Sequence, residues 1–146
     1  MKSSRRRARE LALQALYAWQ LAGGERAEAI EQAKGLEGFE RSDRAFVQEL
    51  VGSVVSRAAE LEEMLAPCIA GRSFAQLSPV ERAILYIGAL ELAAQPETPF
   101  KVVLNEAIEL GKSFGGTEGH RFVNGVLEKL AERLRPEEVA RAKQTA

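Results

Sequence analysis

The sequence predicts an all-α protein of about seven helices, arranged as two small helical bundles packed together. Apolar residues recur at spacings of three and four along most of the 146-residue chain, and no convincing alternation typical of strands is present. Ser, Pro and Gly residues divide these periodic stretches at positions typical of helix caps. Hydrophobic residues at 46% and charged residues at 28% indicate an ordinary globular domain.

The first helix is expected to begin at Ser3 or Ser4, either of which can cap it, and to end at Gly23-Gly24. On a helical wheel its core face comprises Ala8, Leu11, Ala12, Ala15 and Trp19. A short helix is expected over 25–34, with an inward face formed by Ala27, Ile30 and Ala33.

The third helix is the clearest, with Ser42 as its expected N-cap and Pro67 at its end. Its apolar stripe repeats at spacings of three and four and comprises Phe46, Leu50, Val54, Ala58, Leu61 and Leu65. The following segment, 68–77, reads as a connector between two helical halves. We therefore predict one domain over 1–146 with a subdomain boundary near 67–77.

Ser78, Pro79 and Glu81 match the N-cap, N1 and N3 positions of a capping box, which predicts a helix to about Gln95. Thr98-Pro99 begins the next helix, which ends at Gly115-Gly116. Its stripe comprises Phe100, Val103, Leu104, Ala107, Gly111 and Phe114, and Phe114 is expected in the core.

A further helix is expected from about Glu118 to Leu134, and Pro136 begins a short last one. The inward residues of the longer of these two helices are Val123, Val126, Leu127 and Leu130.

Enzyme and membrane signatures are missing from the sequence. One cysteine, Cys68, excludes an intrachain disulfide, and with a single histidine, His120, it cannot build a structural zinc site. No phosphate-binding glycine loop, nucleophile elbow or paired histidines occur. No apolar run reaches about 18 residues, and nothing resembles a signal peptide. We expect a cytoplasmic binding protein without enzymatic activity, cofactor, metal or membrane contact.

Positive charge gathers at the start of the chain although the protein is nearly neutral, with 20 Lys and Arg against 21 Asp and Glu. Any nucleic-acid contact should therefore be local. One stripe of the first helix lies nearly opposite its core face and comprises Arg6, Arg9, Glu10, Leu13, Tyr17 and Gln20. Guanidinium groups that bind phosphates beside a ring that stacks on bases suit single-stranded RNA. The alternative is a solubilising basic terminus with a partly buried Tyr17.

Two other stretches are candidates for binding. Phe122 lies at the edge of an inward stripe, beside Arg121 and on the same side as Lys129 and Arg133, although a phenylalanine there is more often core. The helix after Ser78 is apolar over a wide arc that includes Leu85 and Leu92. Such a helix is central to the core or covers a partner, and a central position is favoured.

Three stretches of the sequence together resemble the NusB family of transcription antitermination factors, and the resemblance extends from Arg5 to about Leu130. They are RRRARELALQALYAWQL, LSPVERAILYIGALEL, and PFKVVLNEAIELGKSFGG followed by HRFVNGVL. The resemblance implies two perpendicular helical bundles. It also implies binding to boxA RNA together with ribosomal protein S10 (NusE), within an RNA polymerase antitermination complex that supports ribosomal RNA transcription.

The resemblance also implies site residues. Its RNA contacts fall on Arg5, Arg6, Arg7, Arg9, Tyr17, Glu118 and Phe122, with which we group Lys2 of the basic start and Arg121 beside Phe122. Its S10 side falls on Glu81, with which we group Arg82 and Leu85. Gly119 departs from the family pattern, in which serine is common. Two alternatives remain: a self-associating helical module that forms a homodimer through Leu85 and Leu92, and the RNA-binding domain of a ribosomal RNA cytosine methyltransferase.

Overall fold

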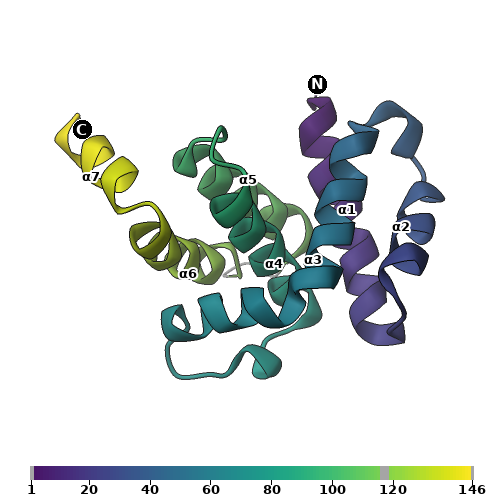
Figure 1. Ribbon diagram of the computed structural model, residues 1–146, viewed down its shortest axis with the longest axis horizontal. Helices are drawn as coiled ribbons and strands as arrows, with labels where there is room; N and C mark the ends of the chain where they lie inside the picture. Colours follow the sequence, from purple (N-terminus) through teal and green to yellow (C-terminus); the bar gives the residue numbers. More distant parts are fainter. Residues whose placement is uncertain (1, 116–118, 146) are drawn as a thin grey trace. The chain divides into compact units, whose positions relative to one another are not determined.

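The computed structural model describes residues 2–115 and 119–145, and within these residues it contains helices and no strand (Figure 1). Seven α-helices and three short 3-10 helices account for its regular structure in this part of the chain. The all-α prediction is therefore confirmed. The chain divides into two compact units, Met1–Glu60 and Leu61–Ala146.

The first unit contains α1 (Ser4–Ala22), α2 (Arg26–Lys34), the 3-10 helix η1 (Phe39–Arg41) and most of α3 (Arg44–Leu65), with α1 and α2 in contact. The predicted caps of α1 are confirmed. The Ser3 Oγ accepts the Arg6 N–H at 3.1 Å, and Gly23 closes the helix at φ 75°, a left-handed conformation that suits glycine. In α2 the buried residues are Ala29 and Ala33, so the inward prediction for Ala27 was wrong.

Asp43 caps α3, and the prediction of Ser42 as the cap was wrong. The Asp43 carboxylate accepts the Phe46 N–H at 3.1 Å, which is the usual N-cap bond. The Ser42 hydroxyl instead donates to the Phe39 carbonyl at 2.6 Å and closes η1. Both residue types cap helices, and only the preceding 3-10 turn decides which of them is used.

The division between the two units lies inside α3, after Glu60, and not in the 67–77 connector. Arg57 interrupts the helix with φ −113° and ψ 16°, and its guanidinium binds the Glu60 carboxylate at 3.0 and 2.9 Å. The apolar spacing continues across this break, which is why the sequence pattern does not reveal it.

The second unit comprises the end of α3 and six further elements: η2 (Ala66–Cys68), η3 (Phe74–Gln76), α4 (Pro79–Ala94), α5 (Phe100–Phe114), α6 (Gly119–Leu134) and α7 (Pro136–Gln144). Helix α4 contacts both α5 and α6, and every residue from Ala83 to Leu92 is buried. A Cβ at Gly88 would lie 2.6 Å from a Leu127 methyl, so this glycine allows α6 to approach. The predicted capping box of Ser78 and Glu81 is present.

Phe114 is 37% exposed, so its predicted place in the core was wrong. Helix α6 approaches α5 closely at Gly111, where an added Cβ would lie 2.8 Å from that of His120. Phe114 is the last residue of α5 and lies nearly one turn beyond this approach. A helical stripe predicts which face is buried, but not where along the helix the neighbour stops.

An arginine that the sequence did not reveal, with a side chain only 9% exposed, joins three elements of the second unit. The Arg135 guanidinium donates hydrogen bonds of 2.6–3.0 Å to the carbonyl oxygens of Glu91, Leu92, Gln95 and Thr98. It also pairs with Glu138 at 3.0 Å, and Glu138 accepts the Phe100 N–H at 2.7 Å. These bonds satisfy groups at the end of α4 and the start of α5, and they anchor α7.

Candidate nucleic-acid interface

The first basic residues of the chain are partly engaged with other side chains of their own unit. The Lys2 ammonium binds the Glu10 carboxylate at 2.8 Å, although 55% of the lysine side chain is exposed. The Arg5 guanidinium lies 3.7 Å from the Asp43 carboxylate and 3.7 Å from the centre of the Phe46 ring. These exposed ion pairs contribute little to stability and can exchange for phosphate contacts.

Arg9 is buried, so the prediction of a solvent-facing stripe was wrong for this residue. Only 4% of Arg9 and 2% of Leu13 are exposed, and the Arg9 guanidinium lies 5.3 Å from the centre of the Phe46 ring. The wheel assumed one buried face, but α1 is buried around most of its circumference between Ala8 and Leu16. The interior position of Arg9 excludes it from an RNA-facing surface in this conformation.

The exposed part of the predicted stripe is Tyr17, of which 39% is accessible. Arg6 and Arg7 are half-buried, and Arg7 lines a surface cavity of about 310 Å³ together with Glu37 and Arg41. Arg6 and Tyr17 are separated by about 16 Å along the helix axis, since a helix rises about 1.5 Å per residue. A ligand that contacts both must therefore extend over several nucleotides.

In the second unit, Phe122 is half-buried near the start of α6, and the guanidinium of Arg72 lies 4.4 Å from its ring centre. The neighbouring Arg121 is exposed. Glu118 lies outside the described residues. Sequence reasoning missed Arg72 because it belongs to an irregular connector far from Phe122 in the chain, and no periodicity relates the two positions.

The connector that carries Arg72 is fixed on both sides. Cys68 and Ile69 are buried before it, and Phe74 is buried after it, with its ring centre 5.0 Å from that of Tyr86 at an angle of 62°. Gly71 has φ 76°, a turn that a residue with a side chain rarely adopts. Burial raises the pKa of the Cys68 thiol although Arg133 and Lys129 oppose this shift, so Cys68 is a poor nucleophile.

The residues grouped on the S10 side have structural roles in the first two turns of α4. The Glu81 carboxylate accepts the Ser78 N–H at 3.1 Å, and the Arg82 guanidinium donates to the Ala75 carbonyl at 3.1 Å. Both side chains remain half-exposed. Leu85 is fully buried, so its prediction as a partner contact was wrong. Leu92 is buried as well, which also removes the predicted surface for self-association.

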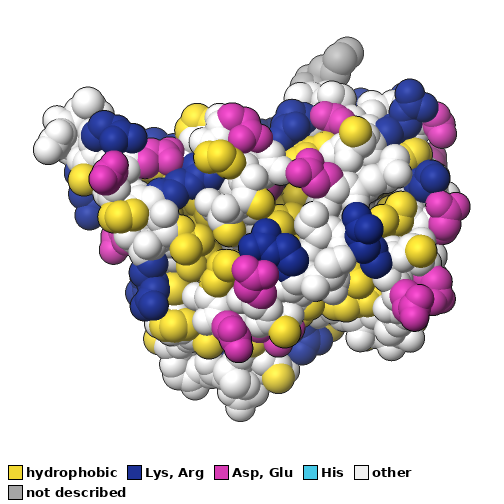
Figure 2. All heavy atoms as spheres, in the orientation of Figure 1, with side chains coloured by type: hydrophobic (Ala, Val, Ile, Leu, Met, Phe, Trp, Pro, Cys, Tyr) yellow, Lys and Arg dark blue, Asp and Glu magenta, His cyan; other side chains and the backbone are white. Residues whose placement is uncertain are grey.

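On the face drawn in Figure 2, Lys and Arg side chains are interspersed with Asp and Glu, and no single broad basic patch is visible. This mixture agrees with the formal net charge of −1. Electrostatic attraction of a polyanion is therefore limited to local groups of cations. Within the described residues, no cluster of three or more potential metal ligands occurs, and no helix is long and apolar enough to cross a membrane.

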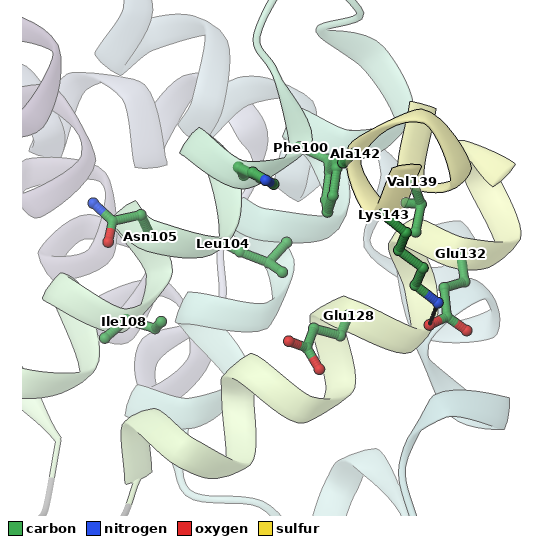
Figure 3. Close-up of a pocket in the computed structure, with 10 residues that line it drawn as sticks. Phe100, Leu104, Asn105, Ile108, Glu128, Glu132, Val139, Ala142 and Lys143 are labelled. Atoms are coloured by element: carbon green, nitrogen blue, oxygen red, sulfur yellow. Dashed lines mark ion pairs between the residues drawn. The ribbon is translucent and has the colours of Figure 1, made fainter. Parts of the chain in front are cut away.

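A cavity of about 550 Å³ lies between α5, α6 and α7 (Figure 3). Its apolar lining includes Phe100, Leu104 and Ile108 of α5 and Val139 of α7. Two cations and two acids also line it: Lys101, Lys143, Glu128 and Glu132. Lys143 pairs with Glu132 at 3.8 Å. With no net charge and an apolar floor, the cavity lacks the features of an RNA site.

Known proteins resemble this chain over most of its length. The NusB family model matches residues 6–132. The transcription antitermination protein NusB of Dechloromonas aromatica is 49% identical over 143 residues, covering 98% of this chain and 87% of the relative. The protein of the same name from Paraburkholderia phytofirmans is 45% identical over 143 residues, covering 98% and 99%.

Solved structures share the fold. A T. maritima NusB structure covers 96% of this chain and 99% of its own, with a TM-score of 0.81 at 24% identity, a likeness that concerns the fold alone. A chain from a crystal structure described as antitermination factors NusB and NusE in complex with dsRNA has a TM-score of 0.76 at 25% identity. It covers 91% of this chain and 99% of its own.

Proposed function

The chain belongs to the NusB family, and we propose that it is an RNA-binding transcription antitermination factor that binds boxA RNA together with ribosomal protein S10 (NusE). The observation that supports this function most strongly is the match to antitermination proteins at 45–49% identity over 98% of the chain. In this role it supports ribosomal RNA transcription within an RNA polymerase antitermination complex.

We assign the RNA contacts to the exposed and half-exposed members of the predicted set. Lys2, Arg5, Arg6 and Arg7 supply cations for phosphates. Lys2 and Arg5 are paired with the carboxylates of Glu10 and Asp43, and their side chains remain 55% and 43% exposed. Tyr17 supplies an exposed aromatic ring for stacking on an unpaired base.

In the second unit, Arg121 and Phe122 belong to the proposed RNA surface, and the family motif adds Glu118. Arg9 is assigned a supporting role, because its buried guanidinium lies over Phe46.

We place the S10 contact around Glu81 and Arg82 at the half-exposed start of α4, with Leu85 as a core residue in the same helix. A structure of NusB with NusE and RNA among those of similar fold supports an assembly of this composition. A carboxylate that caps its own helix can also bind a basic partner, because a carboxylate accepts several hydrogen bonds.

A role without catalysis and a cytoplasmic location complete the proposal. The relatives matched over 87% and 99% of their lengths are named antitermination proteins, which favours this function over a methyltransferase domain. The homodimer alternative has lost its proposed surface, because Leu85 and Leu92 are buried within the chain.

The proposed function is tested by titrating a labelled single-stranded boxA RNA with the protein alone, and then with S10 in excess. We expect specific binding that S10 strengthens, and weaker binding to an RNA of the same composition in scrambled order. Equal affinity with and without S10 would contradict the proposal that the two proteins bind the RNA cooperatively. No binding of boxA RNA under either condition would contradict the RNA-binding function itself.

A further inference from the structure

We infer that Arg72 is an RNA-binding residue of this protein and that its guanidinium, backed by the Phe122 ring, is the surface on which an RNA base stacks. This inference rests on the proposed function and deepens it. It changes the role of Phe122 from a ring that meets the base directly to a support for the group that does.

The first observation is the cover on Phe122. The ring is only half-exposed, and the Arg72 guanidinium carbon lies 4.4 Å from the ring centre, within the range of a cation–π contact. The next residue of α6, Val123, is fully buried, so the helix faces the interior beside Phe122. A base that approaches from solvent therefore meets Arg72 first.

The second observation is that the backbone around Arg72 is held in place. Buried Ile69 precedes it and buried Phe74 follows it. On the distal side, the Ser73 N–H donates to the Gln76 side chain at 2.8 Å, and Arg82 binds the Ala75 carbonyl at 3.1 Å. Less conformational freedom is lost when a ligand binds a group that is already positioned.

The third observation is the distribution of charge along α6. Glu128 and Glu132 line the cavity toward α5 and α7. Lys129 and Arg133 instead lie near Cys68, at the start of the connector that bears Arg72, where their charges lower the pKa of the thiol against the effect of burial. In the part of the chain that the structure describes, no carboxylate forms an ion pair with Arg72. Two exposed cations of α6 thus lie near the start of the connector, and they favour an anionic ligand there.

The chemistry of arginine favours RNA at this position. A guanidinium is planar, so one face can lie on Phe122 while the opposite face stacks on a base. Its N–H groups point outward in the plane and can donate to a phosphate or to a base edge. A lysine ammonium keeps the charge but provides neither the plane nor the fork.

The central test compares Arg72→Lys with Arg141→Lys, an exchange of the same chemistry at an exposed cation of α7 outside the proposed RNA surface. Affinity for boxA RNA is measured with S10 present at several salt concentrations. We expect Arg72→Lys to weaken binding by roughly 5- to 150-fold, the range for loss of one stacked base, without a change in salt slope. The Arg141→Lys control should stay within about twofold of wild type, because it lies outside the proposed surface and charge is retained.

A double-mutant cycle with Phe122→Leu, which keeps an apolar side chain, separates the two modes of stacking. If the base lies on Arg72, Phe122→Leu weakens binding in the wild-type background and has little further effect beside Arg72→Ala. If the base lies on Phe122 directly, the leucine substitution weakens binding equally in both backgrounds. Circular dichroism and thermal unfolding establish that each variant is folded before binding is measured.

Three results would overturn the inference: wild-type affinity in Arg72→Lys, tighter binding by Arg72→Ala, or additive effects in the cycle. The second would mean that Arg72 merely covers the ring. These failures differ from failure of the proposed function, in which the wild-type protein binds no boxA RNA and the inference falls with it.

Discussion

Each unit of the molecule contains an arginine–phenylalanine contact, and the two contacts serve different ends. In the first unit, Arg5 and Arg9 lie over Phe46, and both Phe46 and Arg9 are almost fully buried, at 3% and 4% exposure. In the second unit, Arg72 lies over Phe122, and the arginine is exposed on an irregular connector.

The difference shows that an arginine near an aromatic ring is not by itself a sign of ligand binding. Where helix packing closes over the pair, removing either member leaves a void or an uncompensated group, and the contact stabilises the fold. Where the pair remains at the surface, it adds little to stability but presents a plane and a charge to solvent. Burial therefore separates the two roles, and each prediction below tests that separation.

The largest expected effect is on the two phenyl rings. Phe46→Ala should reduce the free energy of unfolding by about 3–5 kcal/mol, because a fully buried ring leaves a cavity. Phe122→Ala should cost only about 1 kcal/mol, because its ring is half-exposed. Chemical denaturation of both variants measures the difference, and equal losses would mean that Phe122 is a core residue.

Substitution of Arg9 should likewise reduce the stability of the fold more than substitution of Arg72. Arg9→Ala should destabilise the fold by about 1–3 kcal/mol through lost packing and lost partners. Arg72→Ala should change stability by less than about 0.5 kcal/mol, because the side chain is exposed. Arg7→Ala is a matched control on α1 for the first substitution. A stable Arg9→Ala variant with impaired RNA binding would reverse the roles assigned to the two contacts.

A change in the connector backbone tests whether the second contact depends on its position. Gly71 has φ 76°, and an added Cβ meets no atom within 4 Å, so Gly71→Ala introduces backbone strain without a clash. We expect a stability loss of about 1 kcal/mol and weaker RNA binding, because the turn before Arg72 shifts. Gly125→Ala, at an open helical position without positive φ, is the control. Unchanged RNA affinity in Gly71→Ala would mean that RNA binding by Arg72 does not depend on the backbone conformation of the connector.

The smallest expected effect concerns the ion pair of Arg135 with Glu138. This arginine has a structural role although it lies in the same unit as Arg72. Burial alone would raise the pKa of Glu138, but the Phe100 N–H and Arg135 outweigh it and lower this pKa. The stabilisation is present above the unfolded pKa of about 4.3 and is lost as pH falls through the folded pKa. We expect the Glu138→Gln variant to lack this loss of stability at low pH, which should amount to less than about 1 kcal/mol. Identical pH profiles for the two proteins between pH 6 and 2 would contradict this role.

Sequence reasoning predicted the helices well because caps and apolar spacing are local properties. Ser3, Ser78 and Pro136 lie where their chemistry predicts. The errors have nonlocal causes. The wheel placed Arg9 outside because it assumed one buried face, whereas α1 is buried on several sides. The apolar period hid the break at Arg57.

The candidate site was predictable only in part for the same reason. Phe122 and Tyr17 follow from helix faces and from the family motifs. Arg72 and Arg135 act through contacts with residues far away in the chain, and a periodicity of three and four contains no signal for such pairs.

Ultraviolet crosslinking of boxA RNA to the wild-type protein with S10, followed by peptide mapping, tests most directly whether RNA meets the exposed contact. We predict crosslinks at Phe122, in the connector around Arg72 and at Tyr17, and none at Phe46. Crosslinks at Phe46 with none at Phe122 or in the connector would contradict the account, because RNA would then bind where the structure places the core.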